Sequence, residues 1–202
     1  MRPSASQIAR GEGRHTGNGF SRLLGEESAA QIAEFALSLP ILLLFVIGIF
    51  DFSGAVTLKQ KLTNAAREGA RAAAAGPAGD LSDPSQGIPA SVSDAFQVVD
   101  NYFLAEAIPD CGLNGSPPAF SSGLKWVATA NAAPCTSTSG IVLTINRACI
   151  QNIAASSISA IATCVTVQYP YQWQYGKAAS LIGSQFTGPT SIITTAVAFN
   201  EN

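Results

Sequence analysis

The sequence of 202 residues contains a single histidine, His15, and only 12% of its residues are charged. Because His15 lies near the N-terminus, no Ser-His-Asp or Cys-His catalytic set is expected in the later part of the chain. The formal net charge of −2 argues against nucleic-acid binding as a main task. The sequence also lacks a phosphate-binding glycine loop and a cluster of metal ligands. We therefore expect no catalytic site, no metal and no cofactor.

The scattered carboxylates do not change this expectation. Asp94 and Asp100 meet only if folding brings them together, and a solvated helix face is the more common role for such residues than acid–base catalysis. A membrane-anchored enzyme is accordingly the weakest of the functional hypotheses.

A long apolar run is the dominant feature of the sequence. No charged residue occurs from Phe35 to Phe50, and Asp51 is the only one before Lys59. As a helix, residues 35–58 would span about 36 Å, which is enough to cross a hydrocarbon core of ~30 Å. We therefore predict that about residues 35–58 form a transmembrane segment.

The predicted helix is longer than its membrane part. Ser28 and Gln31 have the spacing of a capping box, and the first Gly-Pro break after the run is Gly76-Pro77. These signals predict a continuous helix over residues 28–75. Residues 1–27 are rich in Gly, Ser and Arg, so we expect them to be a disordered tail.

Three residues interrupt the apolar character of this helix. Glu34 lies at its start, where a carboxylate either reaches the membrane interface or pairs with a positive group, such as the free amino terminus of a neighbouring subunit. Pro40 removes a backbone donor and is expected to kink the helix. Asp51 would lie about 26 Å further along, at the opposite interface, with contact to a partner helix as the lesser possibility.

Beyond the membrane part, Ala65, Gly69 and Ala73 form a ridge of small residues at helical spacing. Such a ridge lets another helix approach closely. Two interpretations remain open: the partner is a helix of another subunit, or it belongs to the head domain of the same chain.

Residues 76–202 are predicted to form a separate α+β head domain. Apolar residues at helical spacing, from Val92 to Leu104, indicate a soluble helix over 91–107. An antiparallel sheet packed on this helix is expected. Aromatic residues cluster at positions 169–175, where they form either a contact surface for a partner or part of the hydrophobic core. The predicted strands, rich in β-branched residues, cover 124–130, 141–147, 159–169 and 191–199.

All four cysteines lie in this head, and their spacing contains no C-x-x-C pair. An even number confined to one side of the membrane segment suggests two disulfides in an oxidising compartment; four buried free thiols are the alternative. If strands 141–149 and 159–169 form a hairpin, Cys149 and Cys164 fall opposite each other. The preferred pairing is then Cys149 with Cys164 and Cys111 with Cys135, among the three that four cysteines allow.

The cysteines also indicate the orientation in the membrane. Arginines and lysines occur on both sides of the apolar run, so the positive-inside rule does not decide. Paired cysteines place the head outside the cytoplasm and the N-terminus inside.

Three segments together resemble the TadE-like family of the tight-adherence pilus machinery. They read AQIAEFALSLP at residues 30–40, GIFDF at 48–52 and LTNAAREGAR at 62–71. The later VQYPY at 167–171, with its aromatic loop and final strand, is similar in outline only. The resemblance implies a pseudopilin-like protein of the bacterial inner membrane, with a type IV pilin-like helix and a small extracytoplasmic head. It also implies partners: other pilin-like subunits and platform proteins of pilus assembly.

Some members of the family are cleaved after a glycine by a prepilin-type peptidase, which leaves a glutamate at the fifth mature position. Counting back from Glu34 places this bond between Ala29 and Ala30, with alanine where glycine is expected. If cleaved, the chain has Glu34 in position to neutralise the Ala30 amine of an adjacent subunit. If uncleaved, it keeps its tail as a permanent anchor.

Two classes of function therefore stand. The leading hypothesis is a non-enzymatic minor subunit or assembly factor of a surface pilus. The alternative is a single-span, membrane-anchored binding or adhesion domain that never enters a filament, with the aromatic loop 169–175 as its contact surface.

Overall fold

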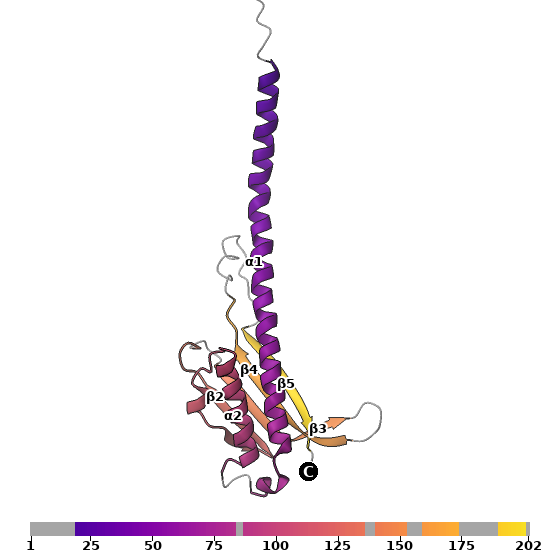
Figure 1. Cartoon of the computed structure of the whole chain (residues 1–202), viewed down its shortest axis with the longest axis vertical. Coiled ribbons are helices and arrows are strands. Elements are labelled where there is room, and N and C mark those ends of the chain that lie inside the picture. Colours follow the sequence, from indigo (N-terminus) through magenta and orange to yellow (C-terminus); the bar gives the residue numbers. More distant parts are fainter. Residues whose placement is uncertain (1–18, 84–86, 136–139, 153–158, 174–189, 201–202) are drawn as a thin grey trace, which may run out of the picture. The chain divides into compact units, whose positions relative to one another are not determined.

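The computed structural model describes residues 19–83, 87–135, 140–152, 159–173 and 190–200 (Figure 1). His15 and residues 1–18 of the predicted tail lie outside these ranges, as do residues 174 and 175 of the aromatic loop. Contacts divide the chain into two compact units, residues 1–47 and 48–202.

Helix α1 runs from Gly19 to Ala75. It begins nine residues before Ser28, so residues 19–27, which we expected to precede the helix, are helical. The stretch before Ser28 contains two leucines, two glutamates and an arginine, which are good helix formers, and it has no proline to stop the helix. The end at Ala75, directly before Gly76-Pro77, is as predicted.

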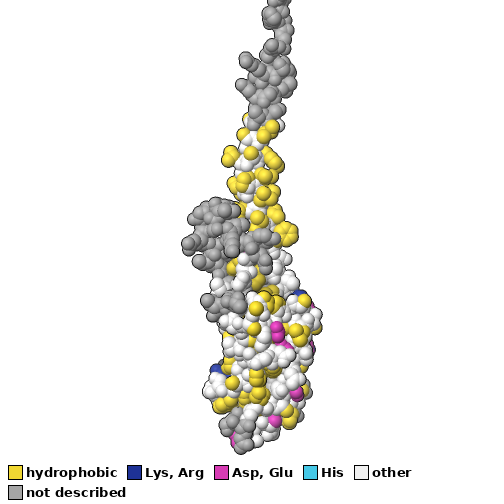
Figure 2. Space-filling model, turned by 90° about the vertical axis from the view of Figure 1, so that its left-hand side faces the viewer, with side chains coloured by type: hydrophobic (Ala, Val, Ile, Leu, Met, Phe, Trp, Pro, Cys, Tyr) yellow, Lys and Arg dark blue, Asp and Glu magenta, His cyan; other side chains and the backbone are white. Residues whose placement is uncertain are grey.

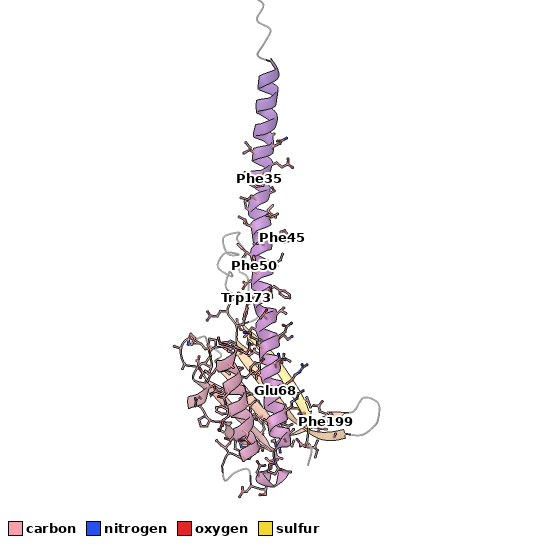
Figure 3. All side chains as sticks on the ribbon, in the orientation of Figure 1. Phe35, Phe45, Phe50, Glu68, Trp173 and Phe199 are labelled. Atoms are coloured by element: carbon pink, nitrogen blue, oxygen red, sulfur yellow. A yellow bond between two sulfur atoms is a disulfide. The ribbon has the colours of Figure 1, made fainter. Side chains whose placement is uncertain are left out.

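Within the first unit, the helix exposes its apolar side chains. An 18-residue window of α1 has a mean hydropathy of 2.5 and no buried residue, so length and composition suit a membrane span. Phe35 and Phe45 are 64% and 71% exposed, and Figure 3 shows them projecting from the ribbon. Figure 2 shows the apolar surface of this part of α1 in yellow. Such a surface is stable only against lipid or protein.

The second unit is built on a five-stranded antiparallel sheet in the order β1-β2-β3-β4-β5. Helix α2 spans Ala90–Ala105, and short 3₁₀ helices cover Ala78–Leu81 (η1) and Leu113–Gly115 (η2). The short strand β1 was not predicted. The strands are β1 (Ala119–Ser122), β2 (Lys125–Ala130), β3 (Ile141–Asn152), β4 (Ser159–Pro170) and β5 (Ser191–Phe199).

The sheet buries one face, because its central strands alternate. On β3, Leu143 and Ile145 are fully buried, and their cross-strand partners Val167 and Val165 are buried with them. The intervening Thr144 and Thr166 lie on the other face and are half-buried. Helices α1 and α2 pack on the buried face, where their side chains join the strands in one hydrophobic cluster. The predicted α+β head, with a helix on an antiparallel sheet, is confirmed.

Helix α2 differs from the prediction at two residues. Leu104 was placed on its buried face but is 58% exposed, whereas the adjacent Phe103 is fully buried. Asp100, expected on a solvated face, is only 6% exposed. Burial raises the pKa of its carboxyl group, and the nearby Asp110 acts in the same direction.

Candidate functional site

The residues that could serve assembly lie along α1. Glu34 is exposed within the apolar part of the helix. Pro40 lies inside the helix, which continues through it. Since proline has no N–H, the carbonyl of Ala36 lacks its usual backbone donor there, and a kink at Pro40 stays a prediction.

The ridge of small residues packs within the chain. Ala65 and Ala73 are fully buried. A Cβ added at Gly69 would lie 2.6 Å from Cγ2 of Val99 on α2 and 3.7 Å from Cγ1 of Val165 on β4. Of the two interpretations left open, the structure therefore favours contact with the chain's own head. The glycine is needed for this close approach of α1 to α2.

Asp51 is also covered by the head. Its residue is 8% exposed, and its backbone carbonyl accepts a hydrogen bond of 3.2 Å from the hydroxyl of Tyr171. Leu58, which we had placed at the far end of the membrane part, packs against the hydrophobic cluster of the head. Contacts with the head are thus already present at Asp51, seven residues before the predicted end of the membrane part.

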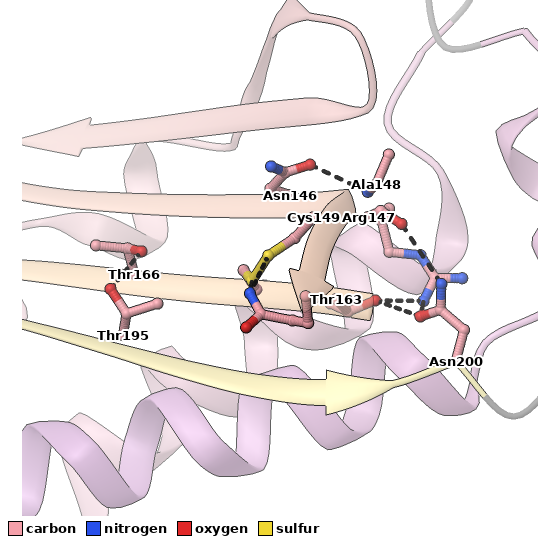
Figure 4. The surroundings of a disulfide bond; sticks show 10 residues. Asn146, Arg147, Ala148, Cys149, Thr163, Thr166, Thr195 and Asn200 are labelled. Atoms are coloured by element: carbon pink, nitrogen blue, oxygen red, sulfur yellow. Dashed lines mark hydrogen bonds between the residues drawn. A yellow bond between two sulfur atoms is a disulfide. The ribbon is translucent and has the colours of Figure 1, made fainter. Parts of the chain in front are cut away.

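A buried arginine, which was not among the residues expected to be functional, binds the backbone carbonyls at the C-terminal end of α1. Arg147 on β3 is 2% exposed, and its guanidinium donates hydrogen bonds to the backbone carbonyls of Ala73 and Gly76, the second at 3.0 Å. It also donates to Thr163 at 3.0 Å and to Asn200 at 3.4 Å (Figure 4). A cation at a helix C-terminus satisfies unpaired carbonyls and opposes the negative end of the helix dipole.

An aspartate caps the N-terminal end of α2 in the same way as the arginine caps the C-terminal end of α1. Oδ2 of Asp80 accepts a hydrogen bond of 2.8 Å from the backbone N–H of Ser91, in the first turn of α2. Burial lowers the pKa of Arg147, and the negative charge of Asp80 raises it again. Arginine remains charged under such shifts because its ordinary pKa is so high. The corner between α1 and α2 is therefore held by two opposite charges, each on the helix end that favours it.

A β-bulge next to Arg147 makes one disulfide possible. Asn146 pairs with Cys164 and Cys149 with Ala162, so Arg147 and Ala148 together oppose Thr163. The extra residue turns Cys149 onto the face of Cys164. Without it, Cys149 would share the buried face of Ile145 and Arg147. The expectation that the two cysteines lie directly opposite each other is therefore wrong; they are diagonal neighbours, with Cα atoms 5.8 Å apart.

The second disulfide joins Cys111 to Cys135, with Cα atoms 5.3 Å apart. These two pairs are the ones that the sequence favoured. Near them, the hydroxyl of Tyr169 donates a hydrogen bond of 3.1 Å to the carbonyl of Pro109. Burial raises the pKa of Tyr169. The loop after α2 is thus tied to the segment that follows β2 by the disulfide, and to the end of β4 by a partly buried hydrogen bond.

Within the described residues, no group of three His, Cys, Asp or Glu side chains is placed to hold a metal ion. The arrangement is suited to packing and anchoring: α1 has a long apolar run with a carboxylate, Glu34, directly before it, and its C-terminal part is packed into the head.

The family model described as TadE-like protein matches residues 29–71 of the chain. No curated protein and no solved structure shows significant similarity to this chain. The matched residues begin at the proposed cleavage point and include Glu34, Pro40, Asp51 and most of the segment of α1 that packs on the head. The match lies within α1, and it confirms the resemblance to the TadE-like family that was seen in the sequence of this segment.

Proposed function

We propose that this chain is a non-enzymatic, pilin-like minor subunit or assembly factor of a tight-adherence pilus. The family match over residues 29–71 carries the proposal. The exposed apolar surface of α1 supports it, because such a helix serves equally as a membrane anchor and as a packing element beside other helices. Its proposed partners are other pilin-like subunits and platform proteins of the assembly machinery.

The same proposal assigns the chain to the bacterial inner membrane as a single-pass protein. Residues 30–50 supply about the 20 apolar positions that a membrane helix needs. This span is shorter than residues 35–58 at its far end, since Asp51 and Leu58 are already in contact with the head. The two disulfides support an extracytoplasmic head and a cytoplasmic N-terminus.

Removing the chain tests the pilus role. In a host that makes tight-adherence pili, deletion of its gene should abolish surface pili seen by electron microscopy, and a plasmid copy should restore them. Normal pili in the deletion strain would contradict the proposal and would favour the alternative function, a membrane-anchored binding domain.

The chain recovered from the restored strain also tests the finer role. An intact mass lacking residues 1–29 would support cleavage between Ala29 and Ala30 by a prepilin-type peptidase, and hence a processed subunit. A full-length mass would instead support a permanently anchored assembly factor.

A further inference from the structure

Two aromatic side chains of the head lie against α1 just beyond the apolar run. The hydroxyl of Tyr171 donates a hydrogen bond to the backbone carbonyl of Asp51. The same hydroxyl oxygen lies 3.7 Å from the position that a Cβ on Gly54 would take. Trp173 packs edge-to-face on Tyr171, with ring centroids 5.1 Å apart and an interplanar angle of 90°. The backbone N–H of Tyr171 also donates to the carbonyl of Thr190 at 2.9 Å. The aromatic pair is therefore fixed both to α1 and to the start of β5.

The pair borders an open groove of about 340 Å³ between α1 and β5. Phe52 and Ile193, on its two walls, are 63% and 56% exposed. Among the described residues of the lining, Lys59 is the one with a charged side chain. Figure 3 shows Trp173 beside the part of α1 that lines the groove. The lining includes Phe52, Ala55, Val56, Lys59, Trp173 and Ile193.

We propose that this aromatic groove is seated in the phospholipid interface of the membrane and fixes the depth of the head. Continuity with the span carries the assignment, because the groove begins at Phe52, two residues after the uncharged run ends at Phe50. The inference rests on the proposed membrane anchorage of α1.

The composition of the groove fits a lipid interface better than water. Tryptophan and tyrosine concentrate at the headgroup level, where the ring is buried and its polar atom stays hydrated. Lysine places its stem along apolar surface and its ammonium beside lipid phosphates. An aromatic pair, exposed apolar walls and one cation thus occur together at the end of the span. A second copy of the chain covering the groove is the competing occupant.

Tryptophan fluorescence can locate the groove, because the chain has only two tryptophans and Trp126 is fully buried in the head. The full chain is reconstituted in vesicles of phosphatidylcholine and phosphatidylglycerol carrying bromine at shallow or deep acyl positions. A Trp126→Phe variant reports Trp173 alone, and Trp173→Phe is the matched control. If Trp126→Phe fails to fold, the difference between the wild type and Trp173→Phe gives the same signal.

We expect shallow bromines to quench Trp173 about twofold, deep bromines less, and aqueous iodide little, as for a side chain at the interface. Trp126 should respond to none of them. Quenching of Trp173 by iodide alone would place the groove in water, and resistance to every quencher would indicate cover by protein. If the chain floats with the vesicles and so is bound to the membrane, either of these two results overturns only the placement of the groove in the lipid interface. A chain that does not float overturns the membrane anchorage as well.

Discussion

Replacing Glu34 with alanine should abolish pilus assembly while leaving the chain in the membrane. Glu34 is an exposed carboxylate in the apolar part of α1, and the TadE-like match includes it. An unpaired charge in that position is costly, so a positive partner, such as the amine of Ala30 in an adjacent subunit, would stabilise packing between helices. Alanine removes that attraction but makes the helix more apolar, so insertion should persist. Glu34→Gln should fail as well, because it keeps the shape and loses the charge.

The matched control for this prediction is Glu68→Ala on the same helix. Glu68 is half exposed and pairs with Arg71 at 3.1 Å, and an exposed pair of this kind contributes only about 0–1 kcal/mol. Pili are counted by electron microscopy, and the chain is quantified in the membrane fraction by immunoblot. Normal piliation with Glu34→Ala would contradict the assembly role of this carboxylate.

Replacing Arg147 with leucine should lower the free energy of unfolding of the head by about 3 kcal/mol. The carbonyls of Ala73 and Gly76 would lose their donor inside the protein, and the half-buried Asp80 would lose the favourable charge of the arginine. Leucine fills part of the volume but makes none of these hydrogen bonds. The loss should also loosen the far end of α1 from the head.

Urea unfolding of the full chain in detergent micelles, followed by near-ultraviolet circular dichroism, measures this loss. Arg71→Leu is the matched control, because Arg71 is an exposed arginine on α1 and its loss should change stability by no more than about 1 kcal/mol. Arg147→Lys should fall between the two, since lysine keeps the charge but lacks the fork that reaches two carbonyls. Equal stabilities for Arg147→Leu and Arg71→Leu would contradict the role of Arg147 at the corner.

Local sequence patterns were sufficient for the main elements. The end of α1 follows from Gly76-Pro77, α2 from apolar spacing, and the longer strands from β-branched alternation. These signals act over a few residues and are visible without tertiary structure. The start of α1 is different, because the polar stretch before Ser28 has good helix formers and its composition alone suggested disorder.

The contacts that hold the head to α1 needed the structure. The bulge at Arg147 and Ala148 adds one residue to β3, and no pattern in the strand reveals a shift of register. One signal was present: Arg147 continues the alternation of Ile141, Leu143 and Ile145 at a position where an apolar residue is expected. A charged residue in a buried series indicates a specific partner.

Tertiary structure also decided between open interpretations. The ridge at Ala65, Gly69 and Ala73 suits any closely packed helix, and only the fold shows α2 of the same chain against it. The contact of Tyr171 with Asp51 joins residues 120 positions apart. Long-range contacts of this kind depend on how β4 ends beside α1, which local propensity does not determine.

The proposed placement of the disulfide-bonded head outside the cytoplasm can be tested on a Gln97→Cys variant. A membrane-impermeant maleimide is applied to whole cells with a permeable outer envelope. Gln97 is exposed on α2, and the four native cysteines are paired. We expect labelling of the variant in intact cells and none of the wild type. Labelling of the variant only after the inner membrane is broken would contradict it.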